Sequence, residues 1–238
     1  MSTKPVRGIS SMATKHLLGE LAREHEGGGG SPIVFESVGG VAAARRVAAG
    51  EPVDLVVLAS GALADLAARG HVQAATLRPF AVSEAALAVR SGAPHPPIAT
   101  REALLETLRD ARSIAYSTGP SGDALLALLD AAGLLGELRP RLVQAPPGVP
   151  VASFVGDGTA QLGVQQLSEL AGCAGIEVVG VLAPQAGMAT TFAIAVAERA
   201  REPRAARAFI ELIVSPRAHA AIRRSRMTPV GDRRVQSG

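Results

Sequence analysis

Short apolar runs alternate with amphipathic stretches along most of this chain. Apolar runs at residues 6–9, 33–35 and 54–59 are each followed by a segment with apolar residues at helical spacing. The run at 54–59, DLVVLA, is continuously apolar, which is typical of a strand buried on both faces of a parallel sheet. Strands that alternate with helices at this pace predict βαβ units and a parallel α/β sheet.

The pattern continues to the C-terminal region. It predicts further strands at 114–116, 142–144, 161–164, 176–181 and 190–196. It predicts helices at 12–25, 41–49, 61–69, 101–110 (capped by Thr100), 121–130, 150–155, 203–214 and 216–225 (capped by Ser215), with a frayed tail from Thr228. No period of 20–50 residues repeats, so a solenoid is excluded.

The rhythm changes at Phe80, where residues 80–90 alternate only loosely before a turn-rich SGAPHPP segment. We place a first crossing between two lobes near residues 79–84. The predicted architecture is two α/β lobes between which the chain crosses twice. Lobe 1 is discontinuous, with residues 1–80 and 190–238, and lobe 2 holds residues 81–189.

The most informative stretch is residues 113–130, SIAYSTGPSGDALLALLD. A short strand leads through a Ser/Thr/Gly/Pro turn, including Ser117, into a Leu-rich helix that we predict to begin at Ser121 as N-cap. Gly122 lets a bound group approach the backbone closely. The first turn of a helix offers unpaired N–H groups and the positive end of a dipole, so this junction is suited to a small anion.

The same strand–Ser/Gly–helix pattern occurs twice more. Ser10 and Ser11 follow the first strand, and Ser37, Gly39 and Gly40 follow the second. Each serine alone is as well explained as an ordinary N-cap. Together they predict a cleft lined with neutral hydrogen-bond donors, because open α/β sheets bind ligands at the carboxyl ends of their strands.

Two adjacent glutamines, Gln165 and Gln166, follow the predicted strand at 161–164. They supply amides at another carboxyl end, and at most one of them faces the cleft because neighbouring strand residues point to opposite faces. Arg78 and Arg90 flank the first crossing, where an arginine could bind a carboxylate bidentately.

Composition narrows the function classes. Hydrophobic residues make up 47% of the 238 residues and aromatic residues only 3%, which argues against a site that stacks sugars or single-stranded nucleic acid on aromatic rings. The formal charge is +3, and the excess lies near the C-terminus at Arg223, Arg224, Arg226, Arg233 and Arg234, which we read as a solvated end. We therefore expect no nucleic-acid partner.

Cys173 is the single cysteine, which excludes an intramolecular disulfide and a cysteine metal cluster. No apolar run is long enough to span a membrane, so we expect no membrane insertion. The N-terminus has no apolar leader. As written, the chain is expected in the cytoplasm, or in the periplasm or outside the cell if a leader has been removed.

Sharp catalytic and cofactor motifs are absent. The dinucleotide fingerprint fails after Gly158, and neither a P-loop nor a G-x-S-x-G elbow occurs. The five histidines are scattered without metal-ligand spacing. The expectation is therefore no cofactor and no metal.

Taken in order, several segments resemble one superfamily: GISSMATKHLL, FESVGGVAAARRVAAGEPVDLVVLA, RPFAVSEAALAVRSGAP, SIAYSTGPSG, LGVQQLSEL and SPRAHAAIRRS. The chain resembles the type II periplasmic binding proteins, in the molybdate-binding-like branch of extracellular solute-binding proteins that also includes aconitate isomerases. The resemblance runs from Val6 to about Pro229. It implies two Rossmann-like α/β lobes joined by two β crossovers, with a ligand cleft between them that closes by hinge motion.

The resemblance also implies which residues bind the ligand. By position they are Ser10 or Ser11, Ser37, Gly39, Gly40, and the turn from Ser117 through Ser121 to Gly122. Molybdate binders resemble one another in a tyrosine where this chain has Gln165, so Gln165 is a further candidate for ligand binding. The difference speaks against molybdate as the ligand and leaves room for a carboxylate. The missing leader is a second departure from family members that serve a transporter.

Two functions stay open. The first is a monomeric solute-binding protein for a small anion, an oxyanion such as molybdate or a short carboxylic acid, with an ABC transporter permease as partner if the protein is exported. The second is a cofactor-independent isomerase that shifts a proton on an unsaturated polycarboxylic acid, as related aconitate isomerases do. That chemistry needs a base near the substrate carbon, and the sequence offers Glu36, Glu84, Asp123 and His16.

Overall fold

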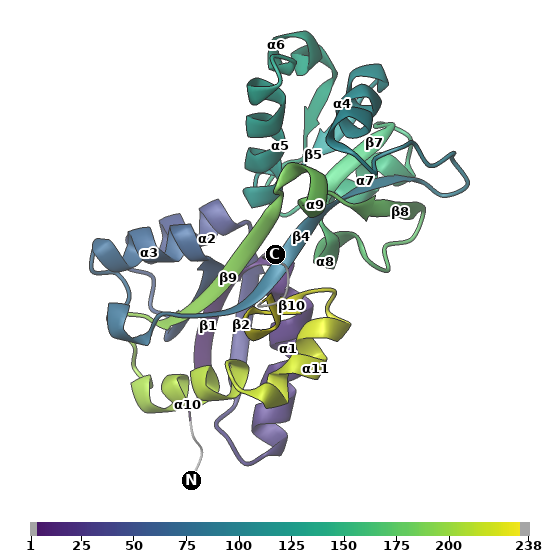
Figure 1. The fold of residues 1–238 in the computed structure, drawn as a ribbon. Coiled ribbons are helices and arrows are strands. Elements are labelled where there is room, and N and C mark those ends of the chain that lie inside the picture. Colours follow the sequence, from purple (N-terminus) through teal and green to yellow (C-terminus); the bar gives the residue numbers. More distant parts are fainter. Residues whose placement is uncertain (1–3, 234–238) are drawn as a thin grey trace. The chain divides into compact units, whose positions relative to one another are not determined.

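The computed structural model describes residues 4–233 (Figure 1). The chain divides into two compact units, unit 1 with residues 1–83 and 191–238 and unit 2 with residues 84–190. Two strands pass from one unit to the other: β4 (Arg78–Arg90) and β9 (Ala189–Val196). The fold class is therefore the expected one of two α/β lobes with two β crossovers.

Unit 1 is built on the strand order β2-β1-β3-β9-β4, with β10 paired to β4. Its strands and helices are β1 (Val6–Ser11), α1 (Lys15–Gly27), β2 (Ile33–Val38), α2 (Gly40–Ala48), β3 (Leu55–Ala59), α3 (Ser60–Ala68), α10 (Pro203–Ile213), α11 (His219–Arg224) and β10 (Thr228–Pro229). Short 3-10 turns lie at Met12–Thr14, Ala74–Thr76, Pro216–Ala218 and Val230–Arg233. β1 pairs in parallel with both β2 and β3, and β9 runs antiparallel to β3.

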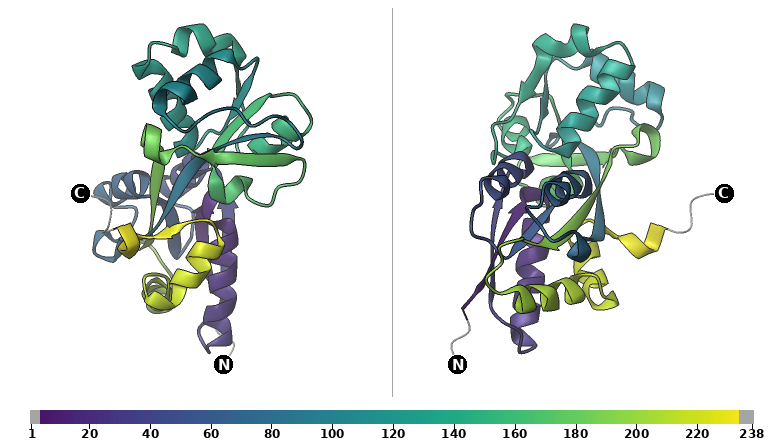
Figure 2. Two further views of the ribbon diagram at one scale, coloured as in Figure 1. Left: turned by 45° about the vertical axis from the view of Figure 1, so that its right-hand side comes forward. Right: turned by 90° about the vertical axis from the view of Figure 1, so that its left-hand side faces the viewer.

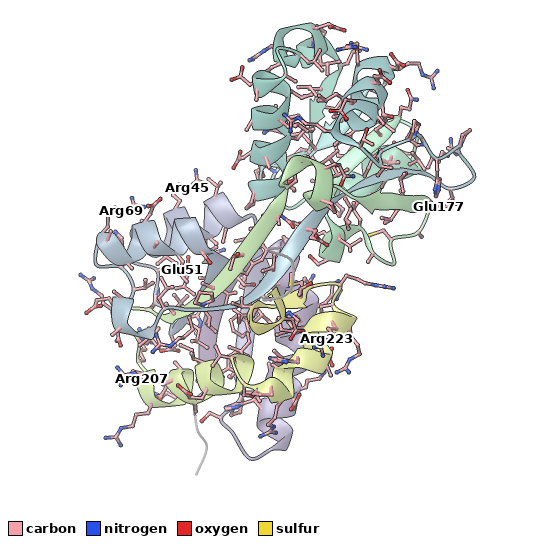
Figure 3. All side chains as sticks on the ribbon, viewed as in Figure 1. Arg45, Glu51, Arg69, Glu177, Arg207 and Arg223 are labelled. Carbon is pink, nitrogen blue, oxygen red and sulfur yellow. The ribbon has the colours of Figure 1, made fainter. Side chains whose placement is uncertain are left out.

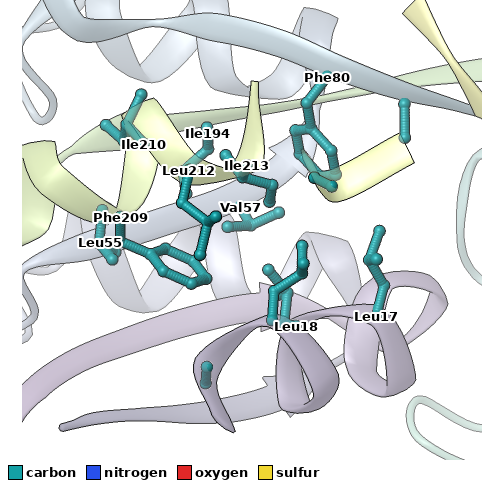
Figure 4. Close-up of a cluster of buried hydrophobic side chains, with 14 of the residues drawn as sticks. Leu17, Leu18, Leu55, Val57, Phe80, Ile194, Phe209, Ile210, Leu212 and Ile213 are labelled. Carbon is teal, nitrogen blue, oxygen red and sulfur yellow. The ribbon is translucent and has the colours of Figure 1, made fainter. Parts of the chain in front are cut away.

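Helices cover both faces of this sheet. α1, α10 and α11 bury one apolar cluster against it, in which Leu17 and Leu18 meet Phe209 and Ile213 (Figure 4). The views of Figure 2 show α1 in purple beside the yellow C-terminal helices. α2 and α3 bury a second cluster against the opposite face. Successive residues of a strand belong alternately to the two clusters, because neighbouring side chains of a strand point to opposite faces of the sheet.

Unit 2 has the strand order β6-β5-β7-β4, with β8 on the other side of β4. Its elements are α4 (Arg101–Asp110), β5 (Ile114–Tyr116), α5 (Pro120–Ala131), α6 (Leu135–Leu138), a 3-10 turn (Arg139–Arg141), β6 (Leu142–Gln144), α7 (Val151–Gly156), β7 (Leu162–Gln166), α8 (Leu167–Leu170), β8 (Ile176–Val181) and α9 (Ala183–Ala186). β5 pairs in parallel with β6 and β7, while β4 runs antiparallel to β7. α4, α5 and α6 pack on one face, and α7 and α8 on the other.

Several element boundaries differ from the prediction. β1 and β2 each run farther than expected, so Ser10, Ser11 and Ser37 belong to strands rather than to the turns after them. The C-terminal segment also pairs with the sheet through β10. Thr228 pairs with Val82 of β4, so the tail is not frayed there; the predicted fraying of residues 234–238, with Arg234, lies outside the described residues.

Of the three predicted caps, one is wrong, one is correct in position only, and one is confirmed. Gly119, not Ser121, is the N-cap of α5, with Pro120 at the first helical position, where a fixed φ favours helix initiation. Ser215 lies at the predicted N-cap position, before the 3-10 turn Pro216–Ala218 that leads into α11, but its hydroxyl donates to the Leu212 carbonyl and makes no capping hydrogen bond. Thr100 does cap α4, since its Oγ1 accepts a hydrogen bond from Ala103 N at 3.2 Å.

The start of α5 depends on Gly122. A Cβ placed there would lie 1.8 Å from the carbonyl oxygen of Ser117, and backbone atoms have little room to move aside. We expect Gly122→Ala to destabilise the protein by about 2 kcal/mol, within the range for overpacked sites. Gly61→Ala is the matched control, because Gly61 also lies in a first helical turn and a Cβ there meets nothing within 4 Å. Urea denaturation measures both; equal midpoints for the two variants would contradict this account.

Candidate functional site

The predicted serines of unit 1 gather at the carboxyl edge of the parallel strands. Ser10 of β1 lies opposite Ser37 of β2, and their hydroxyl oxygens are 2.8 Å apart, so one donates to the other. Ser10 is fully buried. From the sequence, Ser10 and Ser11 were equivalent candidates, but the structure distinguishes them, because the Ser10 hydroxyl is paired with that of Ser37.

Ser11 points to the other face of the sheet, toward α2. A Cβ built on Gly40, the first residue of α2, would lie 3.9 Å from the Ser11 hydroxyl oxygen. That hydroxyl has no hydrogen-bond partner among the residues that the structure describes, although the Ser11 carbonyl accepts from Thr14 Oγ1 at 3.0 Å. Ser11 therefore offers a free donor beside the positive end of a nine-residue helix whose N-cap is Gly39.

A third polar group at this edge was missed by the sequence analysis. Ser60 follows β3 directly as the first residue of α3, and its hydroxyl oxygen is buried without a partner in the described part of the chain. β3 pairs in parallel with β1, so its carboxyl end lies at the same edge as Ser11. Ser60 and Gly61 form a further strand–Ser/Gly–helix junction. The predicted helix at 61–69 left Ser60 outside it, whereas α3 begins at Ser60.

Unit 2 carries the corresponding turn after β5. The hydroxyl oxygens of Ser117 and Ser121 lie 3.1 Å apart, and Gly119 N donates to Ser117 Oγ at 3.3 Å. Ser121 is buried, whereas Ser117 is half-buried. With Gly122 packed against the Ser117 carbonyl, the turn holds both hydroxyls at the start of the twelve-residue helix α5.

The two glutamines of β7 have different roles. Both belong to the strand rather than following it, and both are buried. The predicted residue, Gln165, has a fully used amide: its Oε1 accepts from Val151 N at 3.0 Å, and its Nε2 donates to Glu169 Oε1 at 2.9 Å. Through these two hydrogen bonds, Gln165 links the start of α7 to α8.

Gln166 has a free polar atom instead. Its Nε2 lies 2.9 Å from Thr190 Oγ1, while its Oε1 is buried and has no partner among residues 4–233. A threonine hydroxyl both donates and accepts, so either end of the amide can face Thr190 and the other end is left without a partner in the described part of the chain. β7 neighbours β5, which places Gln166 at the same strand edge as the Ser117 turn.

Charged groups near these turns are few. Glu36 of β2 is held bidentately by Arg46, at 2.6 and 2.8 Å, and this pairing lowers the pKa of its carboxyl. Burial raises the pKa of Asp123 in the first turn of α5. His16 is exposed on α1. Arg78 donates to the backbone carbonyls of Ala75 and Leu77.

Glu169 of α8 is the carboxyl with the largest raised pKa in the described region. Burial raises the pKa of Glu169 to about 7, and the hydrogen bond from Gln165 opposes that shift only in part. Sequence reasoning had no signal for it, because a single glutamate in LSEL has no diagnostic spacing. Its importance comes from the packing of α8 against β7.

Comparison with known proteins places the chain in a family. Residues 6–226 match the family of bacterial extracellular solute-binding proteins. The chain belongs to this family. Within the described residues, no helix is long and apolar enough to cross a membrane.

One curated relative and two solved structures illustrate the range of similarity. An aconitate isomerase from a Pseudomonas species is 38% identical over 186 residues, which cover 78% of this chain and 71% of the relative. The periplasmic molybdate-binding protein of Azotobacter vinelandii superposes with a TM-score of 0.76 at 19% identity, over 94% of this chain and 98% of that one. The substrate-binding domain of a putative molybdenum ABC transporter from Clostridium difficile gives 0.73 at 16% identity, over 95% and 99%.

These matches establish the type II periplasmic binding protein fold. The two structures are too distant in sequence to carry more than the fold. The isomerase is close enough to establish family membership together with the family match. Within the described part of the chain, no cluster of three or more His, Cys, Asp or Glu residues could hold a metal ion.

The unpartnered hydroxyl of Ser60 makes a stability prediction. A buried polar atom without a hydrogen bond costs about 1–3 kcal/mol, so Ser60→Ala in the ligand-free protein should raise the free energy of unfolding by roughly 1 kcal/mol. Ser121→Ala, also in a first helical turn, removes a hydroxyl that is paired with Ser117 and should lower it by a similar amount. Thermal denaturation of both variants checks this, and a Ser60→Ala variant that is destabilised as much as Ser121→Ala would refute it.

Proposed function

We propose that the protein binds a small anion, an oxyanion or a short carboxylic acid, through serine hydroxyls and helix N-terminal amides of the kind that gather at the strand ends of each unit. The single observation that supports this most is the gathering of neutral donors at the carboxyl ends of parallel strands, with Ser11 left unpaired beside α2. Ser117, Ser121 and Gly122 supply the corresponding groups in unit 2. An ABC transporter permease is the partner to which such a protein would deliver its ligand.

The serine hydroxyls and backbone amides are neutral donors, which can bind an anion without holding it as strongly as a cationic side chain would. Hydrogen bonds to a charged group contribute about 1.5–3 kcal/mol each, and micromolar affinity corresponds to about 8 kcal/mol. Four such bonds give about 6–12 kcal/mol, and association costs about 4 kcal/mol or more, so bonds at the upper end of that range are needed for micromolar affinity. No strongly basic side chain is required, and a ligand held in this way leaves readily.

Among anions, we favour a polycarboxylate over molybdate. The 38% identity with an aconitate isomerase supports a carboxylic acid ligand, while the similarity to molybdate-binding structures concerns the fold alone. Gln166 adds an amide that is free on one side.

A thermal-shift and calorimetry series tests the binding function. We expect citrate and the two aconitates to raise the Tm, because a ligand that binds only the folded state stabilises it by mass action, and we expect molybdate, tungstate, sulfate and phosphate to raise it less. Ser11→Ala combined with Ser121→Ala should weaken binding at least 100-fold while the protein stays folded. His16→Ala is the control, because this side chain is exposed on α1, shortly after Ser11 in the chain, and does not belong to the proposed site. Unchanged affinity in the folded double variant would mean that the site lies elsewhere.

A second candidate function is isomerisation of aconitate. The specific observation in its favour is the isomerase relative, which aligns with 78% of this chain. We expect purified protein to interconvert cis- and trans-aconitate, which a proton NMR time course follows directly. No conversion at high protein concentration would exclude this substrate pair and leave the binding function in place.

A further inference from the structure

Glu169 stands at the edge of unit 2 where the proposed ligand groups gather. It lies on α8, which begins directly after Gln166 at the carboxyl end of β7. The neighbouring strand β5 ends at the same edge and leads to Ser117 and Ser121. Glu169 is half-buried, so its carboxyl is shielded by protein without being sealed off.

The hydrogen bonds around Glu169 fix which of its oxygens can carry a proton. Val151 N donates to Gln165 Oε1, so the Gln165 amide cannot turn over without leaving that buried N–H unpaired. Gln165 Nε2 therefore faces Glu169 and donates to its Oε1 at 2.9 Å. Oε1 is an acceptor in both protonation states, and Oε2, which has no partner in the described part of the chain, is the oxygen that gains or loses the proton.

We propose that Glu169 is the base and acid that moves a proton on an unsaturated polycarboxylate, with Gln165 as the residue that positions it. This inference rests on the isomerase candidate described above. The proposed reaction moves one proton between two carbons of the same substrate, so its balance needs no further reactant.

The step balances within the substrate and Glu169. Oε2 of the ionised carboxylate takes a proton from the methylene carbon, and the electrons of that C–H bond form a new C=C bond to the central carbon. The electrons of the old C=C bond take up a proton at the other carbon, from the same Oε2. Glu169 is ionised at the end as at the start, and the C=C bond now joins the central carbon to the former methylene carbon.

The surroundings of Glu169 suit this role. Burial raises the pKa of its carboxyl to about 7, which is close to the value that makes a proton carrier efficient at neutral pH. The groups that face it are neutral: the Gln165 amide, the Val151 backbone beyond it, and Cys173, whose thiol donates to the Glu169 carbonyl and whose pKa is itself raised by burial. Glu36 and Asp123 serve less well, because Glu36 is held by Arg46 and the Asp123 carboxyl is only partly buried, so that its pKa is raised less than that of Glu169.

The test compares the full-length protein with Glu169→Gln and with Glu177→Gln. Glutamine has the shape of the protonated acid and preserves contact with Gln165, but it cannot accept a proton. Glu177 is an exposed carboxylate of β8, paired with His95 and Gly92 on the surface of the same unit, and is the matched control (Figure 3). Aconitate turnover and exchange of its methylene protons in D2O are followed by NMR, and aconitate binding is followed by calorimetry.

We expect Glu169→Gln to lower both turnover and deuterium exchange about 100-fold or more, the range for loss of general acid–base catalysis, while aconitate affinity changes less than threefold. Glu177→Gln should match the wild type. Glu169→Asp should keep measurable turnover with a shifted pH profile, whereas the wild-type profile should report a group near pH 7. This pH readout distinguishes a proton carrier from a merely structural side chain.

Each adverse result has a distinct meaning. Turnover by Glu169→Gln within threefold of the wild type overturns the role of Glu169 alone. Wild-type protein that binds aconitate without turnover or exchange overturns the isomerase candidate and this inference together, and leaves the binding function. Absence of binding by the wild type overturns the polycarboxylate proposal itself.

Discussion

Parallel strand pairing is the constraint on which the rest of this structure depends. β1 pairs in parallel with β2 and β3, and β5 pairs in parallel with β6 and β7. Parallel neighbours need a crossover on each return, so each strand ends at the same edge as its neighbours and is followed by the start of a helix. Helix N-termini and the residues just before them are thereby gathered at one edge of each unit. The local sequence needs only small polar residues there to make that edge a set of hydrogen-bond donors.

The opposite edge of unit 1 shows how the fold is tied down away from those groups. Asp54, buried just before β3, accepts hydrogen bonds from the backbone of Arg7, Arg201 and Glu202, at 2.6–2.9 Å. One carboxylate thus links the start of β1 to the start of α10, whose sequence positions are far apart. Most arginines, such as Arg45, Arg69 and Arg207, are exposed on the outer helices (Figure 3). The positive net charge therefore belongs to the surface, and the donor-rich strand ends stay neutral.

The sequence was sufficient for the fold class and for many elements, because periodicity reports burial directly. The strands β5, β6 and β8 and the helix α4 have the predicted bounds, and the Thr100 cap follows from residue type. It was insufficient at strand ends, where polar residues such as Ser10, Ser37 and Gln166 continue a ladder that their type alone does not favour. Packing between segments decides which hydroxyl is paired and which amide is free. It also decides that the Ser60 hydroxyl is buried and that Glu169 is half-buried. No local pattern encodes them.

Neutral surroundings act on an anion and on a nearby carboxyl in a coupled way. Without a cation to stabilise its charge, a partly buried Glu169 holds its proton up to about pH 7. An anionic ligand bound close to it would raise that pKa further, since like charges disfavour ionisation. The bound anion therefore increases the strength of Glu169 as a base while reducing the fraction that is ionised, and the two effects balance best when the pH lies near the pKa of the complex. In the proposed function, anion binding and proton transfer by Glu169 would depend on the same neutral surroundings, because a cation that strengthened binding would also lower the pKa of Glu169.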